Sequence, residues 1–182
     1  PAVATLSALG PVTFLGRLEH LGVEFRLPKG NRAPGLAVAI GGLAARLRSI
    51  AGLYAGLANA GAYRAPNVRV VSKSEAVSPS RFGTPKRLVG PGSARLITDI
   101  LRTGKPPRAH RNRALGSEPF AIAFKTGTSY GFRDAWAFGY TPSHTSGVWS
   151  GHVDGSPRPG ASGRAAALPL LFDAFAAVAG WA

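Results

Sequence analysis

The residues best suited to chemistry follow one another in one short stretch, Lys125-Thr126-Gly127-Thr128-Ser129. A run of apolar residues leads directly into it, which is typical of a buried strand. Side chains alternate along a strand, so we expect Lys125 and Gly127 on one face and Thr126 and Thr128 on the other. The end of such a strand offers an ammonium group and hydroxyl groups to a carboxylate. It also offers a backbone N–H near Thr128 to an oxyanion.

Gly127 lacks a side chain, so the backbone of an extended peptide could lie against this strand and pair with it. The competing interpretation is an ordinary polar turn, in which Gly127 ends the strand and the hydroxyl groups make turn hydrogen bonds. Three residues in this order recur often by chance. The motif taken alone therefore favours the turn.

Apolar periodicity predicts the helices that surround this stretch. Before the motif, Pro11 and Pro91 each stand where a helix can begin, and Gly22, Gly61 and Gly104 each stand where one can end. We predict helices over residues 11–21, 47–60 and 91–103, the last with Ala94, Ile97 and Leu101 directed inward. After the motif, we predict a final helix with Leu168, Leu171, Phe172 and Phe175 on its buried face.

Residues 63–71 are expected to be extended, and the strands of a sheet are predicted in the last third of the chain. The apolar run 119–124 fits a buried strand, and 133–140 and 145–153 fit two more, joined by a hairpin turn at 141–144. Helices, then an antiparallel meander, then a covering helix form an α+β order. The predicted parts are a helical part over 1–104, a loop over 105–118, and a sheet with its final helix over 119–182.

Composition limits the classes of function. The 182 residues carry 22 Lys and Arg against 8 Asp and Glu, and a net charge of +14 is compatible with an anionic partner. The densest basic cluster, Arg108, Arg111 and Arg113, has no interleaved aromatic residues for stacking bases, so a solvated surface is favoured over nucleic-acid binding. Four separated His and no Cys predict neither a metal site nor a disulfide. No cofactor is predicted.

A longer match changes the balance between the two interpretations of the motif. The stretch 124–140, FKTGTSYGFRDAWAFGY, resembles the sequence around the third active-site motif of class A penicillin-binding proteins, in particular the penicillin-binding protein 1C group. Lys-Thr-Gly is that third motif, beside Ser-x-x-Lys and Ser-Asp-Asn. Residues 147–149 and 154–157 resemble the next strand and loop of that group, and 53–61 resembles a helix that precedes a variable loop.

The resemblance implies a partial serine β-lactamase/transpeptidase-like fold, with an antiparallel sheet packed by helices and the site at the edge of the sheet. It implies that Lys125 stabilises the substrate carboxylate and the neighbouring hydroxyl groups. Thr126 and Thr128 would bind that carboxylate, with Ser129 beside them, and the Thr128 N–H would form half of an oxyanion hole. Gly127 would leave room for the acyl donor. Arg133, Asp134 and Trp136 are expected to shape the strand and its turn.

Two motifs of the family are missing. No serine of the chain is followed three residues later by a lysine, and no Ser-x-Asn occurs. We therefore expect residues 1–182 to be the C-terminal part of one transpeptidase domain, with the nucleophile and the second motif upstream of Pro1. The chain alone is expected to be inactive, because members of a catalytic unit do little without the nucleophile.

By the same resemblance, the parent protein would be a peptidoglycan D,D-transpeptidase that cross-links stem peptides through an acyl-serine. Its partners would be D-Ala-D-Ala stem peptides and β-lactams. It would lie at the periplasmic face of the bacterial inner membrane, held through a segment absent here, and would carry a glycosyltransferase domain. The alternatives are a non-catalytic penicillin-binding or sensor module and, less favoured, a basic nucleic-acid-binding domain.

Overall fold

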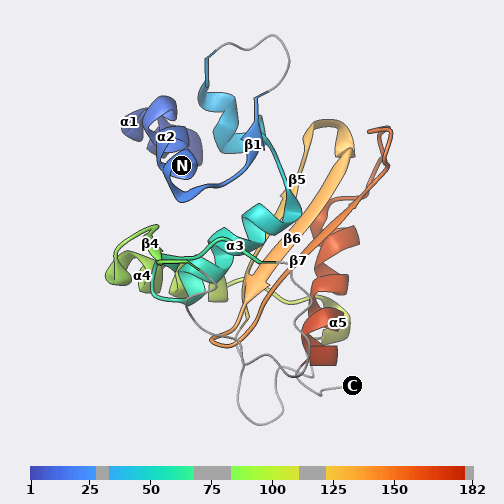
Figure 1. Ribbon diagram of the computed structural model, residues 1–182. Helices are drawn as coiled ribbons and strands as arrows, with labels where there is room; N and C mark the ends of the chain where they lie inside the picture. The colour runs from blue at the N-terminus through green and yellow to red at the C-terminus, as the bar shows by residue number, and fades with distance from the viewer. Residues whose placement is uncertain (28–32, 68–82, 111–121, 179–182) are drawn as a thin grey trace.

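A computed structural model describes residues 1–27, 33–67, 83–110 and 122–178. Figure 1 shows a central sheet with helices on both faces and a separate group of helices near the N-terminus. The helices are α1 (Ala2–Leu9), α2 (Pro11–Leu21), α3 (Leu47–Ala58), α4 (Pro91–Arg102) and α5 (Leu168–Val178), with the 3-10 helices η1 (Leu36–Ile40), η3 (Arg108–His110) and η5 (Tyr130–Phe132) and the π-helical turn η6 (Gly163–Ala167). The strands are β1 (Phe25–Arg26), β2 (Ala44–Ala45), β3 (Ala62–Tyr63), β4 (Lys86–Arg87), β5 (Ala123–Thr128), β6 (Asp134–Tyr140) and β7 (Thr145–Gly151).

The principal sheet of the described residues is an antiparallel meander in the order β5-β6-β7. Strand β6 pairs without interruption on both sides, from Asp134 opposite Gly151 to Tyr140 opposite Thr145 on the β7 side. The turn at 141–144 closes through a hydrogen bond from the Thr141 N–H to the His144 carbonyl, 2.8 Å long. The predicted hairpin is therefore confirmed, with each of its strands one or two residues shorter.

The first strand differs from its predicted bounds. We placed it at 119–124, but β5 begins at Ala123 and continues to Thr128, while residues 119–121 lie outside the described part. The Lys-Thr-Gly-Thr stretch thus lies within the strand, which agrees with the expected alternation of its side chains but not with the predicted bounds. The apolar run misled the prediction because Thr126 and Thr128, although polar, are β-branched and pair well with small residues of β6.

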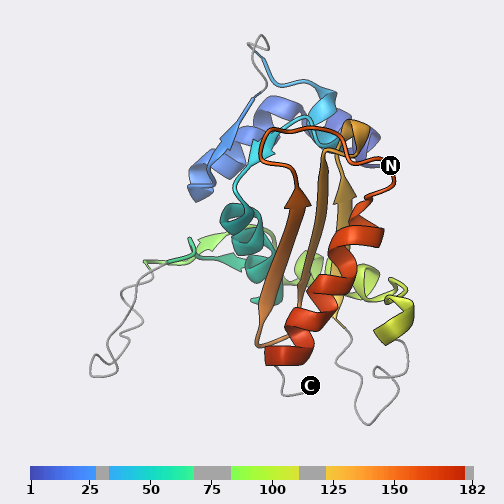
Figure 2. The same ribbon diagram turned by 90° about the vertical axis from the view of Figure 1, so that its right-hand side faces the viewer.

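Helix α5 covers one face of the sheet, as Figure 2 shows. Leu168 and Leu171 are fully buried and Phe175 is nearly so, which confirms the predicted inward face. These residues form one core with small residues of β6, Ala135 and Ala137. Small side chains on the strand let a helix of large side chains approach closely.

Helix α3 covers the opposite face. The Tyr54 ring stacks on Phe138 of β6, with centroids 5.2 Å apart. Its most buried positions are small residues, Ser49, Gly52 and Gly56, and both glycines lie close to Tyr63. A Cβ on Gly52 would lie 2.8 Å from the Pro66 ring. Gly52 and Gly56 are four residues apart and therefore lie on the same face of the helix, where another segment packs closely.

Helix α4 corrects one prediction. Ala94 is buried as expected, but Ile97 is 39% exposed. The position that turns inward is Thr98, whose hydroxyl lies 2.8 Å from the Tyr140 hydroxyl of β6. The helical period predicted that one face of α4 is directed inward, and Ala94 lies on that face. The hydrogen bond between the Thr98 and Tyr140 hydroxyl groups places Thr98, one residue after Ile97, at the inward position.

The helices near the N-terminus have a core of their own. Leu15, Leu18 and Leu21 of α2 pack with Val23 and Tyr63, and Phe14 and Val38 lie partly buried against them. Two short antiparallel pairs, β1 with β2 and β3 with β4, join this core to the rest. The predicted helical part therefore also contains strands. No helix in the described ranges has both the length and the apolar character needed to cross a bilayer.

Candidate active site

Strand β5 carries the motif along the side of a cavity of about 820 Å³. All five residues from Lys125 to Ser129 line it. The strand occupies an outer position in the three-stranded sheet, so one of its backbone edges has no strand partner among the described residues. The arrangement fits the expectation of a site at the edge of a sheet.

The two faces of β5 differ as predicted. Lys125 stands opposite Phe138 and Gly127 opposite Trp136, and these aromatic rings stack with centroids 5.8 Å apart toward the α3 side. On the other face, the Phe124 ring packs edge-on against Phe172 of α5. Lys125 and Gly127 thus lie on the same face of the sheet as the aromatic rings of Trp136 and Phe138.

Lys125 is an exposed cation whose ammonium group donates a hydrogen bond to the Thr126 carbonyl. None of the ion pairs between described residues involves it. A lysine that bonds only to its own strand keeps two N–H donors for another group, because an ammonium has three. An anion in the cavity would therefore meet an uncompensated positive charge.

Thr128 is fixed from behind. Its hydroxyl oxygen accepts a hydrogen bond from the Gly163 N–H, 2.9 Å long, at the start of η6. A Cβ on Gly163 would lie 2.2 Å from the Gly127 carbonyl oxygen and 2.5 Å from that of Trp136. Only glycine permits this approach, so Gly163 braces the strand end that carries the Thr128 N–H. The hydroxyl proton of Thr128 stays available for a ligand.

Sequence reasoning placed the close backbone approach at Gly127 and missed Gly163. A Cβ on Gly127 would meet Trp136 at an ordinary 3.6 Å, so the cavity side of this glycine is open. Gly163 was missed because its partners lie 35 residues away in sequence. The one local signal is Ser162, whose hydroxyl accepts a hydrogen bond from the Ala165 N–H and caps the turn.

Ser129 closes the connection from β5 to β6. Its hydroxyl accepts a 2.8 Å hydrogen bond from the Asp134 N–H, and its own N–H donates to the Asp134 carbonyl. This is the turn bonding that the competing interpretation of the motif described, and it applies to this residue. Asp134 in turn accepts a 2.9 Å hydrogen bond from the Trp149 indole.

Tyr54 also lines the cavity. Burial, with the nearby Tyr140, raises the pKa of Tyr54 to about 12. Its phenol therefore stays protonated across the physiological range and cannot act as a general base there. The described part of the cavity supplies a cation, hydroxyl groups and backbone donors, which bind and polarise a ligand, and one carboxylate, Asp134, which accepts a hydrogen bond from the Trp149 indole.

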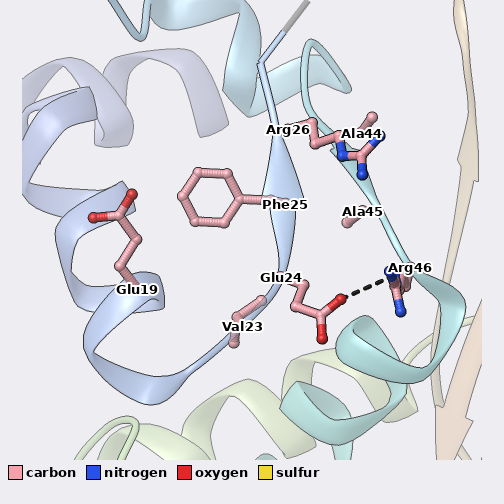
Figure 3. Close-up of a pocket in the computed structure, with 8 residues that line it drawn as sticks. All are labelled: Glu19, Val23, Glu24, Phe25, Arg26, Ala44, Ala45 and Arg46. Atoms are coloured by element: carbon pink, nitrogen blue, oxygen red, sulfur yellow. Dashed lines mark ion pairs between the residues drawn. The ribbon is translucent and has the colours of Figure 1, made fainter.

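Other places suit chemistry less well. A second cavity, of about 580 Å³, lies between α2 and the β1–β2 pair (Figure 3). Its Glu24 is already paired with Arg46 at 2.9 Å and Arg48 at 3.1 Å, so its charges largely neutralise one another. The described residues contain no cluster of His, Asp and Glu able to hold a metal ion. Of the basic cluster, Arg108 lies in η3, and Arg111 and Arg113 fall outside the described residues.

Comparison with known proteins gives consistent matches. No family model matches the chain. Penicillin-binding protein 1C of Escherichia coli (strain K12) is 36% identical over 171 residues, which is 94% of this chain and 20% of that protein. Penicillin-binding protein 1A/1B of Bacillus subtilis (strain 168) is 29% identical over 83% of this chain and 18% of that protein. The chain thus spans about a fifth of the curated relatives it matches.

Solved structures agree with these matches. PonA1 of Mycobacterium tuberculosis, in complex with penicillin V, superposes with a TM-score of 0.57 at 28% identity, over 82% of this chain and 43% of that one. Penicillin-binding protein 1A from Haemophilus influenzae has a TM-score of 0.66 over 97% of this chain and 32% of its own, and at 18% identity it supports the fold alone. In sequence and in fold, the chain is a relative of the penicillin-binding proteins and spans one part of their length.

Proposed function

We propose that this chain is part of a peptidoglycan D,D-transpeptidase and supplies the carboxylate-binding and oxyanion-binding wall of its active site. One observation carries the proposal: β5 presents Lys125, Gly127 and the Thr128 backbone along a cavity at the edge of the sheet. The match to penicillin-binding protein 1C covers this stretch within its 171 residues. The nucleophile belongs to a part of the parent protein that this chain does not include.

The proposed chemistry follows from charge and direction. A D-Ala-D-Ala stem peptide ends in a carboxylate, and penicillins carry one too. Lys125 and the hydroxyl groups of Thr126 and Thr128 hold that carboxylate. The serine supplied by the parent then attacks the carbonyl carbon, and the Thr128 N–H stabilises the oxyanion that forms. The bond between the two D-Ala residues then breaks, the terminal D-Ala leaves as an amine with the proton that the serine gave up, and the acyl group stays on the serine. An amine of a second stem peptide next attacks this ester, forms the new amide bond, and releases the serine with its proton restored. No cofactor takes part, and the parent protein acts at the cell wall.

A non-catalytic penicillin-binding module is the second candidate, because the lone chain lacks any serine with a lysine three residues later. Two measurements separate the candidates. The isolated chain should give no band labelled by fluorescent penicillin on a denaturing gel, whereas the full-length protein should give one; a labelled isolated chain contradicts the assignment of the nucleophile to another part of the protein. Because a penicillin-binding sensor would also be labelled, release of D-Ala from a stem peptide by the full-length protein is what excludes the non-catalytic module.

The role of Lys125 is tested by the second-order rate of acylation of the full-length protein by a penicillin. A charge-assisted hydrogen bond contributes about 1.5–3 kcal/mol, so Lys125→Ala should slow acylation about ten- to a hundredfold or more. Lys125→Arg should be milder, because a planar guanidinium does not replace a compact ammonium. Lys105→Ala is the matched control, since Lys105 is also exposed but lies outside the cavity lining.

Thr128→Val adds a second readout. It should weaken carboxylate binding through loss of the hydroxyl proton and leave the backbone oxyanion donor in place. It also removes the acceptor of the Gly163 N–H, so the free energy of unfolding must be measured alongside. Acylation of Lys125→Ala at the wild-type rate would refute the assignment. A loss of folding in that variant would instead make Lys125 a structural residue.

A further inference from the structure

A buried histidine and an exposed aspartate join two segments behind the sheet. His110 ends η3 and is only 8% exposed, and its Nε2 lies 2.8 Å from the Oδ1 of Asp173 on α5. An ionised carboxylate only accepts hydrogen bonds, so Nε2 carries a proton and donates it. The other ring nitrogen, Nδ1, is buried with no hydrogen-bond partner among the described residues. A buried polar atom without a partner costs free energy, so its retention needs an explanation beyond packing.

The pair does not depend on surface that the rest of the parent protein could cover. Residues within the described part of the chain already bury His110. Asp173 is the one charged residue in the sequence of α5, LPLLFDAFAAV. The single carboxylate of an otherwise apolar helix thus stands at the position where it meets this histidine.

The imidazole of His110 also packs on a row of aromatic rings that ends beside the motif. The centroids of His110 and Phe172 lie 5.5 Å apart, and those of Phe172 and Phe124 lie 5.4 Å apart. Phe124 directly precedes Lys125 in β5. Its ring is enclosed elsewhere too, because a Cβ on Gly104 would lie 2.6 Å from it. In a core this close-packed, a shift of the Phe172 ring moves Phe124 and the start of the motif with it.

Helix α5 therefore holds β5 at two places. One is Phe124, through Phe172, and the other is Thr128, through the Gly163 N–H of η6, which continues directly into α5. A displacement of α5 along its axis would disturb both. The hydrophobic effect has no direction, whereas a hydrogen bond weakens steeply when its distance or angle changes. A hydrogen bond from the neighbouring η3 is thus suited to fix where α5 lies along the sheet (Figure 2).

We infer that His110 and Asp173 are positioning residues for the motif strand: their hydrogen bond fixes α5 along β5 and so places Lys125 and the Thr128 N–H for acylation. This inference rests on the proposed function. Neither His110 nor Asp173 lines the cavity, so both act through β5 and not on the ligand. Misplaced groups slow the chemical step, because stabilisation of a transition state depends on their geometry.

The test uses the full-length protein and penicillin V. Measuring the rate of acylation against penicillin concentration separates the acylation step from reversible binding. Asp173→Ala removes the acceptor and should slow the acylation step about five- to tenfold, with reversible binding changed less than about twofold. Asp173→Asn keeps an acceptor oxygen and should retain at least about half of the wild-type rate. Leu170→Ala is the matched control, at another exposed position of the same helix, and should equal the wild type.

A second variant breaks the bond from its buried side. His110→Leu should slow the acylation step as Asp173→Ala does. The double variant should be no slower than His110→Leu alone, because the two changes remove one and the same interaction. Thermal melts show the temperatures at which each variant is fully folded, and rates compared there do not register a loss of stability alone.

The outcomes are distinct. A slower acylation step in Asp173→Ala, restored in Asp173→Asn and absent from Leu170→Ala, supports the inference. A wild-type rate in Asp173→Ala, a change confined to reversible binding, an equal fall in Leu170→Ala or a failure of Asp173→Ala to fold overturns it, while the proposed function stands. If penicillin V does not acylate the wild type, the proposed function fails and the inference fails with it.

Discussion

The cavity beside β5 lies between two regions of the molecule that differ in how tightly their apolar side chains are packed. On one side, β5, β6 and α5 form a continuous core in which Ala137, Leu168 and Leu171 have no exposed surface. On the other side, the helices near the N-terminus leave Val12 69% and Ile40 71% exposed. The sheet and α5 are thus densely packed, and the motif strand β5 belongs to this region. The region near the N-terminus leaves more apolar surface exposed among the described residues.

The largest expected effect tests how tightly η6 packs against β5. Gly163→Ala should destabilise the chain by about 4 kcal/mol or more, because its Cβ would meet two backbone carbonyl oxygens that cannot move aside. Urea unfolding followed by circular dichroism measures this directly. A loss below about 1 kcal/mol would show that η6 can move away from β5. The difference in packing between the sheet and the helices near the N-terminus would then disappear.

The next effect compares the two packing densities. Leu171→Ala should cost about 3 kcal/mol, because it leaves a cavity in a core where the leucine is fully buried. Val12→Ala removes a similar aliphatic group from an exposed position of α2 and should change the free energy of unfolding by less than about 0.5 kcal/mol. Similar losses in the two variants would mean that the N-terminal helices are covered in solution.

The contact between α3 and the sheet can be followed by pH. The raised pKa of Tyr54 means that the folded chain holds the phenol proton more tightly than the unfolded chain does. Stability from this residue is thus complete below pH 10 and lost between pH 10 and 12. Tyr54 is only half-buried, so we expect a loss of about 1–2 kcal/mol at the upper end. Tyr54→Phe should lose less stability over this window, and an equal loss would contradict the assigned cause.

The smallest effect has the opposite sign. Gly16 lies within α2, and a Cβ there would have no neighbour within 4 Å. Gly16→Ala should therefore raise the free energy of unfolding by about 0.5–1 kcal/mol, through the higher helix propensity of alanine. Thermal melts would detect it as a small rise in Tm. A destabilisation would show that the apparently open face of α2 contacts another part of the chain.

Local patterns predicted a large share of the fold. The hairpin of β6 and β7, the buried face of α5 and the start of α4 at Pro91 all follow from periodicity and turn residues, and each is confirmed. The α+β class is confirmed as well, and the motif strand lies at the edge of the three-stranded sheet among the described residues, as the resemblance implied. These features depend on contacts between residues that are near in sequence or that repeat with a fixed period.

Features that depend on distant partners were missed. The inward turn of Thr98 depends on Tyr140, and the bracing of β5 depends on Gly163. The exposed position of Ile40 depends on how η1 packs on α2, which an apolar run cannot express. For the site, all five residues from Lys125 to Ser129 line the cavity. The roles of these five residues in binding stay predictions, and Ser129 visibly serves the turn.

The hydrogen bond between the Gly163 N–H and the Thr128 hydroxyl has a spectroscopic consequence. When the hydroxyl proton of Thr128 is donated to a carboxylate, its oxygen becomes a stronger acceptor, because successive hydrogen bonds polarise one another. The Gly163 amide proton should then move downfield and exchange more slowly with deuterium, although Gly163 touches no ligand. Glycine amides fall in a sparse region of a nitrogen–proton correlation spectrum. This one signal would therefore report occupancy of the cavity from the far face of the sheet.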